Sequence, residues 1–411
     1  MGTTFNRISM IEDKWNIDTL YLLFILFVSP LLISIFSVLG LPSQIISYAN
    51  TFLTLFFAVI VIYIRSTDQS RVVGIFKENF TLIVFFFVYI FHMIYDLYVI
   101  NVKTDTFSDK SSYLLYTFFI TLVPSIGIIF SEKINFKQLL KTGFLLLFMT
   151  LCFALWFNLR ESNNLANELR SRSDNVMGPL TLGHYGVSFA IISMLLIIQK
   201  SNLKSKILYV FCLLFGLFAM YMAASRSPLV ALFVCLSLIF FIQKGIGKGG
   251  VVLAMIILPF LFFGNSIISS LTSFNSSFVQ RILLSLDKGD SSGRDIIYKQ
   301  GMDQFFENPL FGGSFLINQG TYEGYYPHNM ILEALMTTGL IGSFFFFKWL
   351  VRVLKSSFFI IKIYPNYSWI AVLFIQYCVF GLSSKSFYTN YLFWYYAFLT
   401  MNFFYNPKED I

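Results

Sequence analysis

Residues 324–342 join a polar stretch to an apolar one, and they read Gly-Tyr-Tyr-Pro-His-Asn-Met-Ile-Leu-Glu-Ala-Leu-Met-Thr-Thr-Gly-Leu-Ile-Gly. Pro327 fixes φ where a helix can begin, and Asn329 can cap that helix. The chain is then mainly apolar over 329–348, a length that can cross a lipid bilayer. The stretch therefore predicts a membrane-spanning helix that begins at 329, with His328 at the membrane surface.

Two further features of this segment indicate that it packs inside the protein. Ala334, Thr338 and Gly342 recur every four residues, and such a face of small side chains lets another helix approach closely. Glu333 is a carboxylate within the apolar run, where ionisable groups are costly and are by default suspected of function. Two interpretations of Glu333 stay open: it orients the His328 imidazole, or it is a structural hydrogen-bond acceptor.

The composition of the whole chain excludes an ordinary soluble globular protein. Its 411 residues are 57% hydrophobic, 19% aromatic and only 12% charged. We expect one all-α polytopic transmembrane domain over 1–411. Apolar runs predict twelve helices, at 20–39, 45–64, 80–100, 112–130, 139–158, 181–199, 206–224, 228–243, 250–268, 329–348, 366–382 and 388–404.

Several other classes of protein and site are excluded by pattern. The four cysteines fall in apolar runs at no metal-like spacing, so we expect neither disulfides nor a zinc site. The run at 20–39 is too long for the apolar core of a secretion signal and is kept as the first span. The net charge of +8 does not indicate nucleic-acid binding, because no basic stripe with interleaved aromatics lies outside the apolar runs.

The basic residues predict the orientation. Eighteen of the 29 lysines and arginines fall on one side, in short segments, and this side is therefore cytoplasmic, with both termini. The outer side has two long loops, at 159–180 and 269–327. Within the second, spacing predicts an amphipathic helix near 274–286 and a short helix from about 292 to 308. The Gly-, Asn- and Tyr-rich end of that loop, including Tyr325, offers aromatic faces and amides that suit sugars.

Arginine is enriched on the outer side. Five of the nineteen lysines lie there, but six of the ten arginines do, namely Arg160, Arg170, Arg172, Arg226, Arg281 and Arg294. The guanidinium fork suits bidentate binding of phosphate or carboxylate, so this face is typical of one that recognises a phosphorylated substrate. The alternative is that these arginines pair with lipid headgroups or with acids such as Asp174, Asp295 and Glu307.

The three histidines differ in their expected places. His328 has the strongest functional case, at an outer helix start with a carboxylate nearby. His184 starts the sixth span and is expected at the interface. His92 lies inside the third span with Asp96 one turn later, so the two can pair on one helix face, as a proton relay or as a structural pair.

A short outer hairpin, Ser225-Arg226-Ser227-Pro228, forms a second candidate site. Ser227 can cap the eighth span, and Pro228 can occupy its first position. Free N–H groups, the helix dipole and the Arg226 guanidinium would together attract an anion such as a pyrophosphate.

These motifs together resemble a known family. Ser225-Arg226-Ser227, Gly293-Arg294 with Tyr298, Asn308-Pro-Leu-Phe-Gly312 and His328-Asn329 with Glu333 occur in an order similar to that of the O-antigen polymerase and O-antigen ligase family, over about 220–345. The resemblance implies a GT-C-type glycosyltransferase of the bacterial inner membrane. It would act at the periplasmic face on glycans linked to undecaprenyl pyrophosphate, without nucleotide sugar, cofactor or metal, and a chain-length regulator protein is a possible partner.

The resemblance also implies roles for residues. Arg226 and Arg294, with Arg172 or Arg170 as additions, would hold the pyrophosphate, and His328 would activate the acceptor hydroxyl. We expect a polymerase, which adds the growing glycan to the next lipid-linked repeat unit. The alternatives are a ligase, which transfers the glycan to lipid A-core, and a twelve-span flippase or transporter with His92 and Asp96 as its relay.

Overall fold

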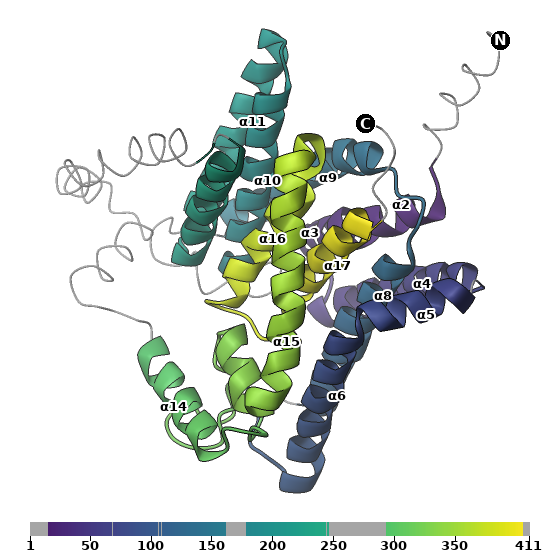
Figure 1. Cartoon of the computed structure of the whole chain (residues 1–411). Coiled ribbons are helices and arrows are strands. Elements are labelled where there is room, and N and C mark those ends of the chain that lie inside the picture. The colour runs from purple at the N-terminus through teal and green to yellow at the C-terminus, as the bar shows by residue number, and fades with distance from the viewer. Residues whose placement is uncertain are drawn as a thin grey trace.

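The computed structural model describes residues 15–405 apart from 68, 106, 108, 162–177, 244 and 246–292. These residues form helices and connections and no strand (Figure 1). Nine described helices are long and apolar enough to cross a membrane, which confirms an all-α polytopic membrane protein. They are Ile17–Val38, Ile45–Arg65, Phe80–Ile100, Ser111–Phe130, Phe136–Phe157, Leu180–Gln199, Leu203–Met222, Arg226–Gln243 and Met330–Ile363.

Shorter elements subdivide and connect these spans. Three of the spans contain π-helical turns, in which the backbone hydrogen bond reaches one residue further than in an α-helix. In chain order the elements are α2 (Ile17–Leu23), η1 (Phe24–Val28), α3 (Ser29–Val38), α4 (Ser43–Arg65), α5 (Gln69–Glu78), α6 (Phe80–Tyr95), η2 (Asp96–Ile100), α7 (Ser111–Leu115), η3 (Tyr116–Leu122), α8 (Val123–Phe130), α9 (Phe136–Glu161), α10 (Pro179–Gln199), α11 (Leu203–Met222), α14 (Arg294–Glu307), α15 (Met330–Ile363), η5 (Pro365–Tyr367), α16 (Ser368–Gly381) and α17 (Tyr391–Tyr405).

The predicted spans agree with these helices in most places. The first eight each coincide with an observed helix, and the short outer helix predicted from 292 to 308 is α14. The last two, 366–382 and 388–404, are the helices α16 and α17, which are 14 and 15 residues long. The predicted span at 250–268, the predicted amphipathic helix at 274–286 and the arginines Arg170, Arg172 and Arg281 lie outside the described residues.

The helix predicted to start at 329 is not continuous. Gly339, with φ 62° and ψ −166°, interrupts α15 after its first nine residues, 330–338. The chain from 308 to 313 lies against this break and supplies its hydrogen-bond partners. Leu340 N–H donates to the Pro309 carbonyl at 2.8 Å, and Gly313 N–H donates to the Met336 carbonyl at 2.8 Å.

Glycine is required on both sides of this contact. A Cβ on Gly312, which has φ +83°, would lie 2.2 Å from the Thr337 carbonyl oxygen. A Cβ on Gly339 would lie 2.4 Å from the Leu310 carbonyl oxygen. The backbone cannot move aside as a flexible side chain can. The loop at 308–313 can therefore approach α15 this closely only with glycine at both 312 and 339.

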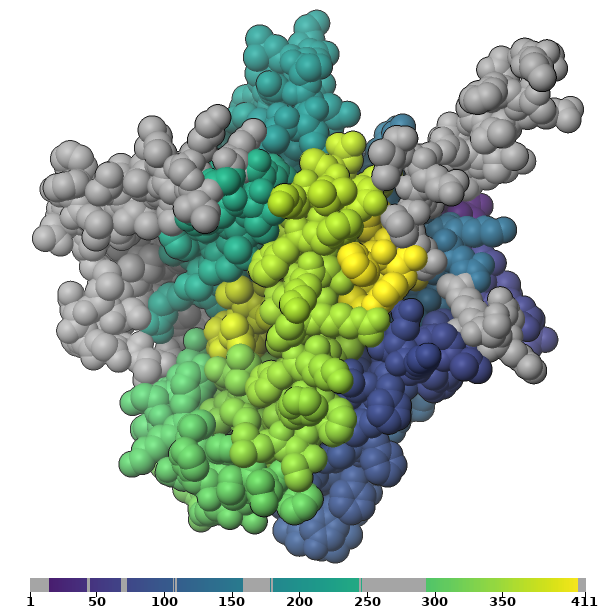
Figure 2. Space-filling model, viewed as in Figure 1, coloured from purple at the N-terminus to yellow at the C-terminus, as the bar shows by residue number. Residues whose placement is uncertain are grey.

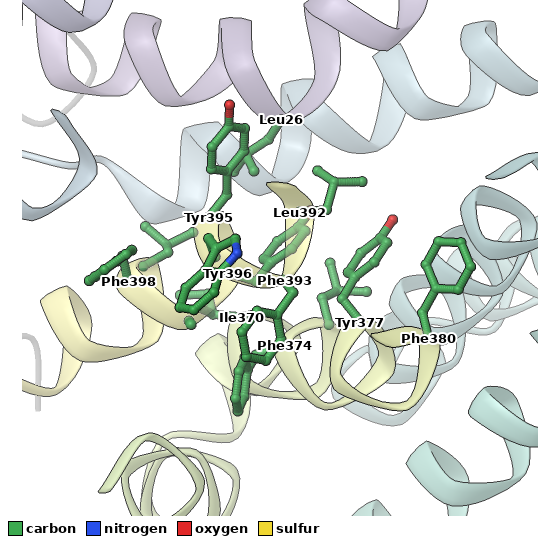
Figure 3. Packing of buried hydrophobic residues seen from close by; sticks show 14 of the residues in the cluster. Leu26, Ile370, Phe374, Tyr377, Phe380, Leu392, Phe393, Tyr395, Tyr396 and Phe398 are labelled. Atoms are coloured by element: carbon green, nitrogen blue, oxygen red, sulfur yellow. The ribbon is translucent and has the colours of Figure 1, made fainter. Parts of the chain in front are cut away.

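The C-terminal helices α16 and α17 form the aromatic centre of the bundle. Figure 3 shows their side chains interleaved, with Tyr377 of α16 against Tyr396 of α17, whose ring centroids are 5.5 Å apart and nearly parallel. Trp349, Trp369 and Trp394 are fully buried nearby. This core fixes the connection 382–390 between α16 and α17. The four cysteines are free thiols.

Different elements meet at the two ends of the bundle. One end, here the Asp18 end, collects the start of α2, the end of α4 and the connection 131–135, where the Arg65 guanidinium pairs with Asp18 at 2.8 Å. The other, the His328 end, collects α14, the start of α15 and the connection 382–390. The described chain begins at the Asp18 end and returns to it, since the Phe136 and Phe403 rings contact at 5.1 Å.

Candidate active site

His328 stands at the joint between the loop that follows α14 and the start of α15. Asn329 caps α15 as predicted, because its side-chain oxygen accepts the N–H groups of Ile331 at 3.0 Å and Leu332 at 3.2 Å. His328 itself has φ 53°, a left-handed conformation that is uncommon for residues other than glycine. Pro327 and Met330 on either side are buried, so the joint lies within protein, as expected.

The His328 imidazole has a defined tautomer in its neutral form. Nδ1 lies 3.4 Å from the backbone carbonyl oxygen of Ser384, which can only accept a hydrogen bond. Nδ1 therefore carries the hydrogen, and Nε2 keeps its lone pair. Burial lowers the pKa of His328 to about 4, and the positive charges of Arg294 and Lys385 act in the same direction. The imidazole is thus an unprotonated base at neutral pH.

Arg294 reaches the same residue from another element. It is the first residue of α14, and its Nη2 donates to the Ser384 hydroxyl at 3.2 Å. Burial lowers the pKa of the Arg294 guanidinium, and the nearby charge of Arg226 adds to this effect. Ser384 therefore holds the two main candidates together: its side chain binds Arg294 and its carbonyl binds His328.

Arg226 joins this group through two serines. It begins the helix Arg226–Gln243, two residues before the predicted start, so Ser227 and Pro228 lie in the first turn instead of at the cap. The Ser227 hydroxyl lies 2.7 Å from that of Ser383, the neighbour of Ser384. The structure thus brings Arg226, Arg294 and His328 together around 383–384, although they lie far apart in sequence.

Lys385 is a fourth member that the sequence did not single out. Its Nζ lies 5.7 Å from the centre of the Phe380 ring, and its charge contributes to lowering the pKa of His328. Burial lowers the pKa of Lys385 itself. Within the described part of the chain, neither Lys385 nor Arg294 forms an ion pair with a carboxylate. In the sequence, Lys385 could have been noticed as a lysine in the short connection between the predicted spans 366–382 and 388–404.

His184 lies in the second turn of α10 and is buried within the protein, while its expected level at the membrane interface stays a prediction. Its ring stacks on Phe380 with centroids 3.7 Å apart, and its Nε2 lies 3.2 Å from the Ser227 hydroxyl. It therefore stabilises the position of Ser227, which in turn contacts Ser383. Leu182 and Gly183 beside it are buried as well, and a Cβ on Gly183 would lie 2.6 Å from the Pro228 ring.

Glu333 does not contact His328. Its carboxylate is fully buried and accepts the Tyr89 hydroxyl at 2.6 Å and the Phe387 N–H at 3.1 Å. Of the two interpretations left open, the geometry matches the structural hydrogen-bond acceptor. Because Phe387 lies in the connection 382–390, Glu333 anchors the segment that carries Ser384 and Lys385.

His92 and Asp96 do not form the expected pair. Asp96 Oδ2 accepts the Phe315 N–H at 2.8 Å, while the His92 ring lies beside the backbone of Phe311 and Gly313. The i, i+4 spacing was compatible with pairing, but both side chains instead contact the backbone of the loop at 311–315. They hold the loop at 311–315, which packs on the interrupted helix α15.

Of the two adjacent tyrosines, Tyr326 and not Tyr325 lies against the histidine. The Tyr326 and His328 rings are 4.2 Å apart. The Tyr325 hydroxyl instead bonds Asp105, on the connection between η2 and α7.

Part of the site lies within a region of the chain that resembles a known family, while Ser384, Lys385 and His184 lie outside that region. Residues 211–347 match the model of a protein family described as O-antigen ligase. The resemblance predicted from the motifs is confirmed, and the matched region contains Arg226, Arg294 and His328. No curated protein sequence matches the chain. The match supports a role in polysaccharide assembly and a reaction of the glycosyltransferase kind.

Proposed function

We propose that this protein is a GT-C-type glycosyltransferase of the bacterial inner membrane that polymerises a surface polysaccharide. It transfers the growing glycan from undecaprenyl pyrophosphate to the non-reducing-end hydroxyl of the next lipid-linked repeat unit, at the periplasmic face. The observation that carries the proposal is the meeting of a neutral histidine and an arginine on one residue, Ser384, beside the cations Arg226 and Lys385.

The cations serve the donor half of the reaction. When the bond between the sugar and the pyrophosphate breaks, negative charge develops on the leaving oxygens. Preorganised guanidinium and ammonium groups in a partly buried site stabilise that charge strongly, because little water is present to screen it. Arg294 is fixed by Ser384, and Lys385 is fixed by a connection that Glu333 anchors. Arg170 and Arg172 remain proposed additions to this set.

His328 serves the acceptor half. A sugar hydroxyl is a poor nucleophile at neutral pH, and it needs a base at hydrogen-bonding distance. Nε2 of His328 takes the hydroxyl proton as the oxygen attacks the anomeric carbon. The resulting imidazolium is stabilised by the Ser384 carbonyl on Nδ1, and the departing pyrophosphate offsets the charges of Arg294 and Lys385, which otherwise disfavour protonation.

The ligase is the second candidate, and the match to a family described as O-antigen ligase is compatible with either enzyme. It shares the donor and the proposed residues and differs in the acceptor, which is lipid A-core. A flippase or transporter is the third candidate. Its proposed proton relay is not supported by the contacts of His92 and Asp96, which both bind the loop at 311–315.

Reconstitution of the purified protein with one lipid-linked repeat unit as both donor and acceptor tests the proposal. A ladder of products differing by one repeat supports the polymerase. Transfer only when lipid A-core is supplied supports the ligase. Absence of a new glycosidic bond in both assays would refute both enzymatic functions.

A further inference from the structure

A groove lies along α15 far from His328, towards the Asp18 end. Its volume is about 740 Å³, and its apolar wall is formed by Phe344, Phe347, Val351, Phe359 and Phe404. Figure 2 shows the face on which α15 meets the end of α17. Phe344 is 60% exposed and Val351 48%, so this wall is open to whatever surrounds the protein.

Three cations follow the same wall: Lys348, Arg352 and Lys355. Lys348 and Lys355 are exposed and two helical turns apart, about 10 Å along the axis. Arg352 lies between them, where it donates to the Glu78 carbonyl at 2.6 Å and its guanidinium lies 5.1 Å from the centre of the Tyr405 ring. In the described residues none of the three forms an ion pair with a carboxylate.

Among the described residues, the acidic side chain near this row is that of Glu78. Burial raises the pKa of the Tyr405 hydroxyl, the charge of Arg352 lowers it, and the charge of Glu78 raises it. Among the described residues, this one carboxylate faces three cations, and their summed charge is positive. An anion can therefore be held there without displacing a structural ion pair.

The neighbouring helix α5 indicates the level of these cations in the membrane. It exposes Val73 by 67% and Phe76 by 57%, next to the exposed Lys77. A short helix with exposed apolar side chains beside a lysine is typical of one that lies in the headgroup region. Since α5 ends at Glu78, whose carbonyl binds Arg352, the cation row lies at that level.

We propose that this groove binds an anionic phospholipid, with its phosphate between Lys348 and Lys355 and its acyl chains along the phenylalanine wall. A lipid satisfies both halves of the surface at once, whereas a soluble anion would leave the aromatic wall uncovered. Basic pockets beside membrane helices are suited to acidic headgroups. The site lies away from the His328 end and does not depend on the proposed reaction.

Lipid binding to the purified full-length protein tests this site. Native mass spectrometry would count the molecules of phosphatidylglycerol and of phosphatidylcholine retained by the wild type, by Lys348→Gln/Lys355→Gln, and by Lys200→Gln/Lys204→Gln. The last variant removes two exposed lysines outside the groove. We expect the wild type and this control to prefer phosphatidylglycerol by about 10-fold, and the groove variant to lose that preference.

Three results would overturn the proposal. They are an equal affinity of the wild type for the two lipids, an equal loss in both lysine variants, and displacement of the lipid by millimolar inorganic phosphate. The second would mean that charge anywhere on this face suffices, and the third that the groove selects a soluble anion.

Discussion

The buried or partly buried cations at the two ends of the bundle have different partners. At the Asp18 end, Arg65 pairs with Asp18 at 2.8 Å, and the same carboxylate accepts the backbone N–H groups of Glu132 and Lys133. At the His328 end, Arg294 rests on the hydroxyl of Ser384, and Lys385 lies beside a phenylalanine ring. Neither of these two has a carboxylate partner in the described part of the chain.

Under the proposed function, this difference separates charges that stabilise the fold from charges that bind the substrate. A buried carboxylate with an arginine and two backbone donors is satisfied, and removing one partner exposes a large desolvation cost. Cations whose protein contacts are neutral groups keep an uncompensated positive charge. A negatively charged ligand can supply the missing opposite charge. The proposed function follows from this contrast.

The largest effect should come from His328→Ala. Without the base on the acceptor side, we expect the rate of glycan transfer in the reconstituted assay to fall about 100- to 10,000-fold. Thermal unfolding should stay close to that of the wild type, because the side chain is bonded through one long contact at 3.4 Å. A variant that still elongates glycan at the wild-type rate would remove His328 from the mechanism.

Arg294→Gln and Arg65→Gln should have opposite consequences. The first removes a donor to the leaving group and should slow transfer about 100-fold while leaving the melting temperature little changed. The second leaves Asp18 buried without its cation and should cost about 3 kcal/mol of stability, with the activity of the folded fraction kept. Measuring the initial rate and the melting temperature of both variants tests the contrast. The same phenotype for both arginines would contradict it.

The pH profile tests the coupling between Lys385 and His328. Because the pKa of His328 lies at about 4, below its usual value, kcat/KM should hold as the pH falls through 6 and decline only nearer 4. Lys385→Met removes a positive neighbour, so the pKa of His328 rises and the acid limb should move to higher pH by up to about one unit. Lys355→Met, near the other end of α15, should not move it. An acid limb near 6.5 in the wild type would contradict this environment.

The smallest effect is expected for Asn329→Ala. Losing the cap of α15 should cost about 1 kcal/mol, visible as a small fall in melting temperature, with a modest fall in transfer rate because His328 precedes the cap. Asn329→Asp, which can still cap, should restore both. If Asn329→Ala abolished transfer without changing stability, Asn329 would act on the substrate itself.

The sequence was informative where the signal is local. Apolar runs placed eight spans, and Pro327 with Asn329 placed the start of α15. The motifs selected Arg226, Arg294 and His328, which the fold brings together. The sequence was less informative about which residues hydrogen-bond to these side chains. Ser384 lies 90 residues from Arg294, and Tyr89 lies 244 residues from Glu333, so no periodic pattern links either pair.

Local patterns also allowed wrong conclusions where tertiary contacts override them. His92 and Asp96 have the spacing of a helical pair, yet Asp96 binds the N–H of Phe315, 219 residues away. Gly339 falls within a helix by composition, but the backbone of 308–313 takes the place of its helical hydrogen bonds. Such long-range competitors cannot be read from a single segment.

Binding of a polyprenyl pyrophosphate tests the central claim most directly. The titration should use protein that carries Lys348→Gln/Lys355→Gln, so that the α15 groove does not contribute, and should compare the pyrophosphate with the same polyprenyl alcohol. We expect the pyrophosphate to bind at least about 10-fold more tightly, a preference that Arg294→Gln abolishes and Arg65→Gln leaves intact. Equal affinity for pyrophosphate and alcohol, or a preference that Arg294→Gln leaves unchanged, would contradict the assignment of the His328 end as the donor site.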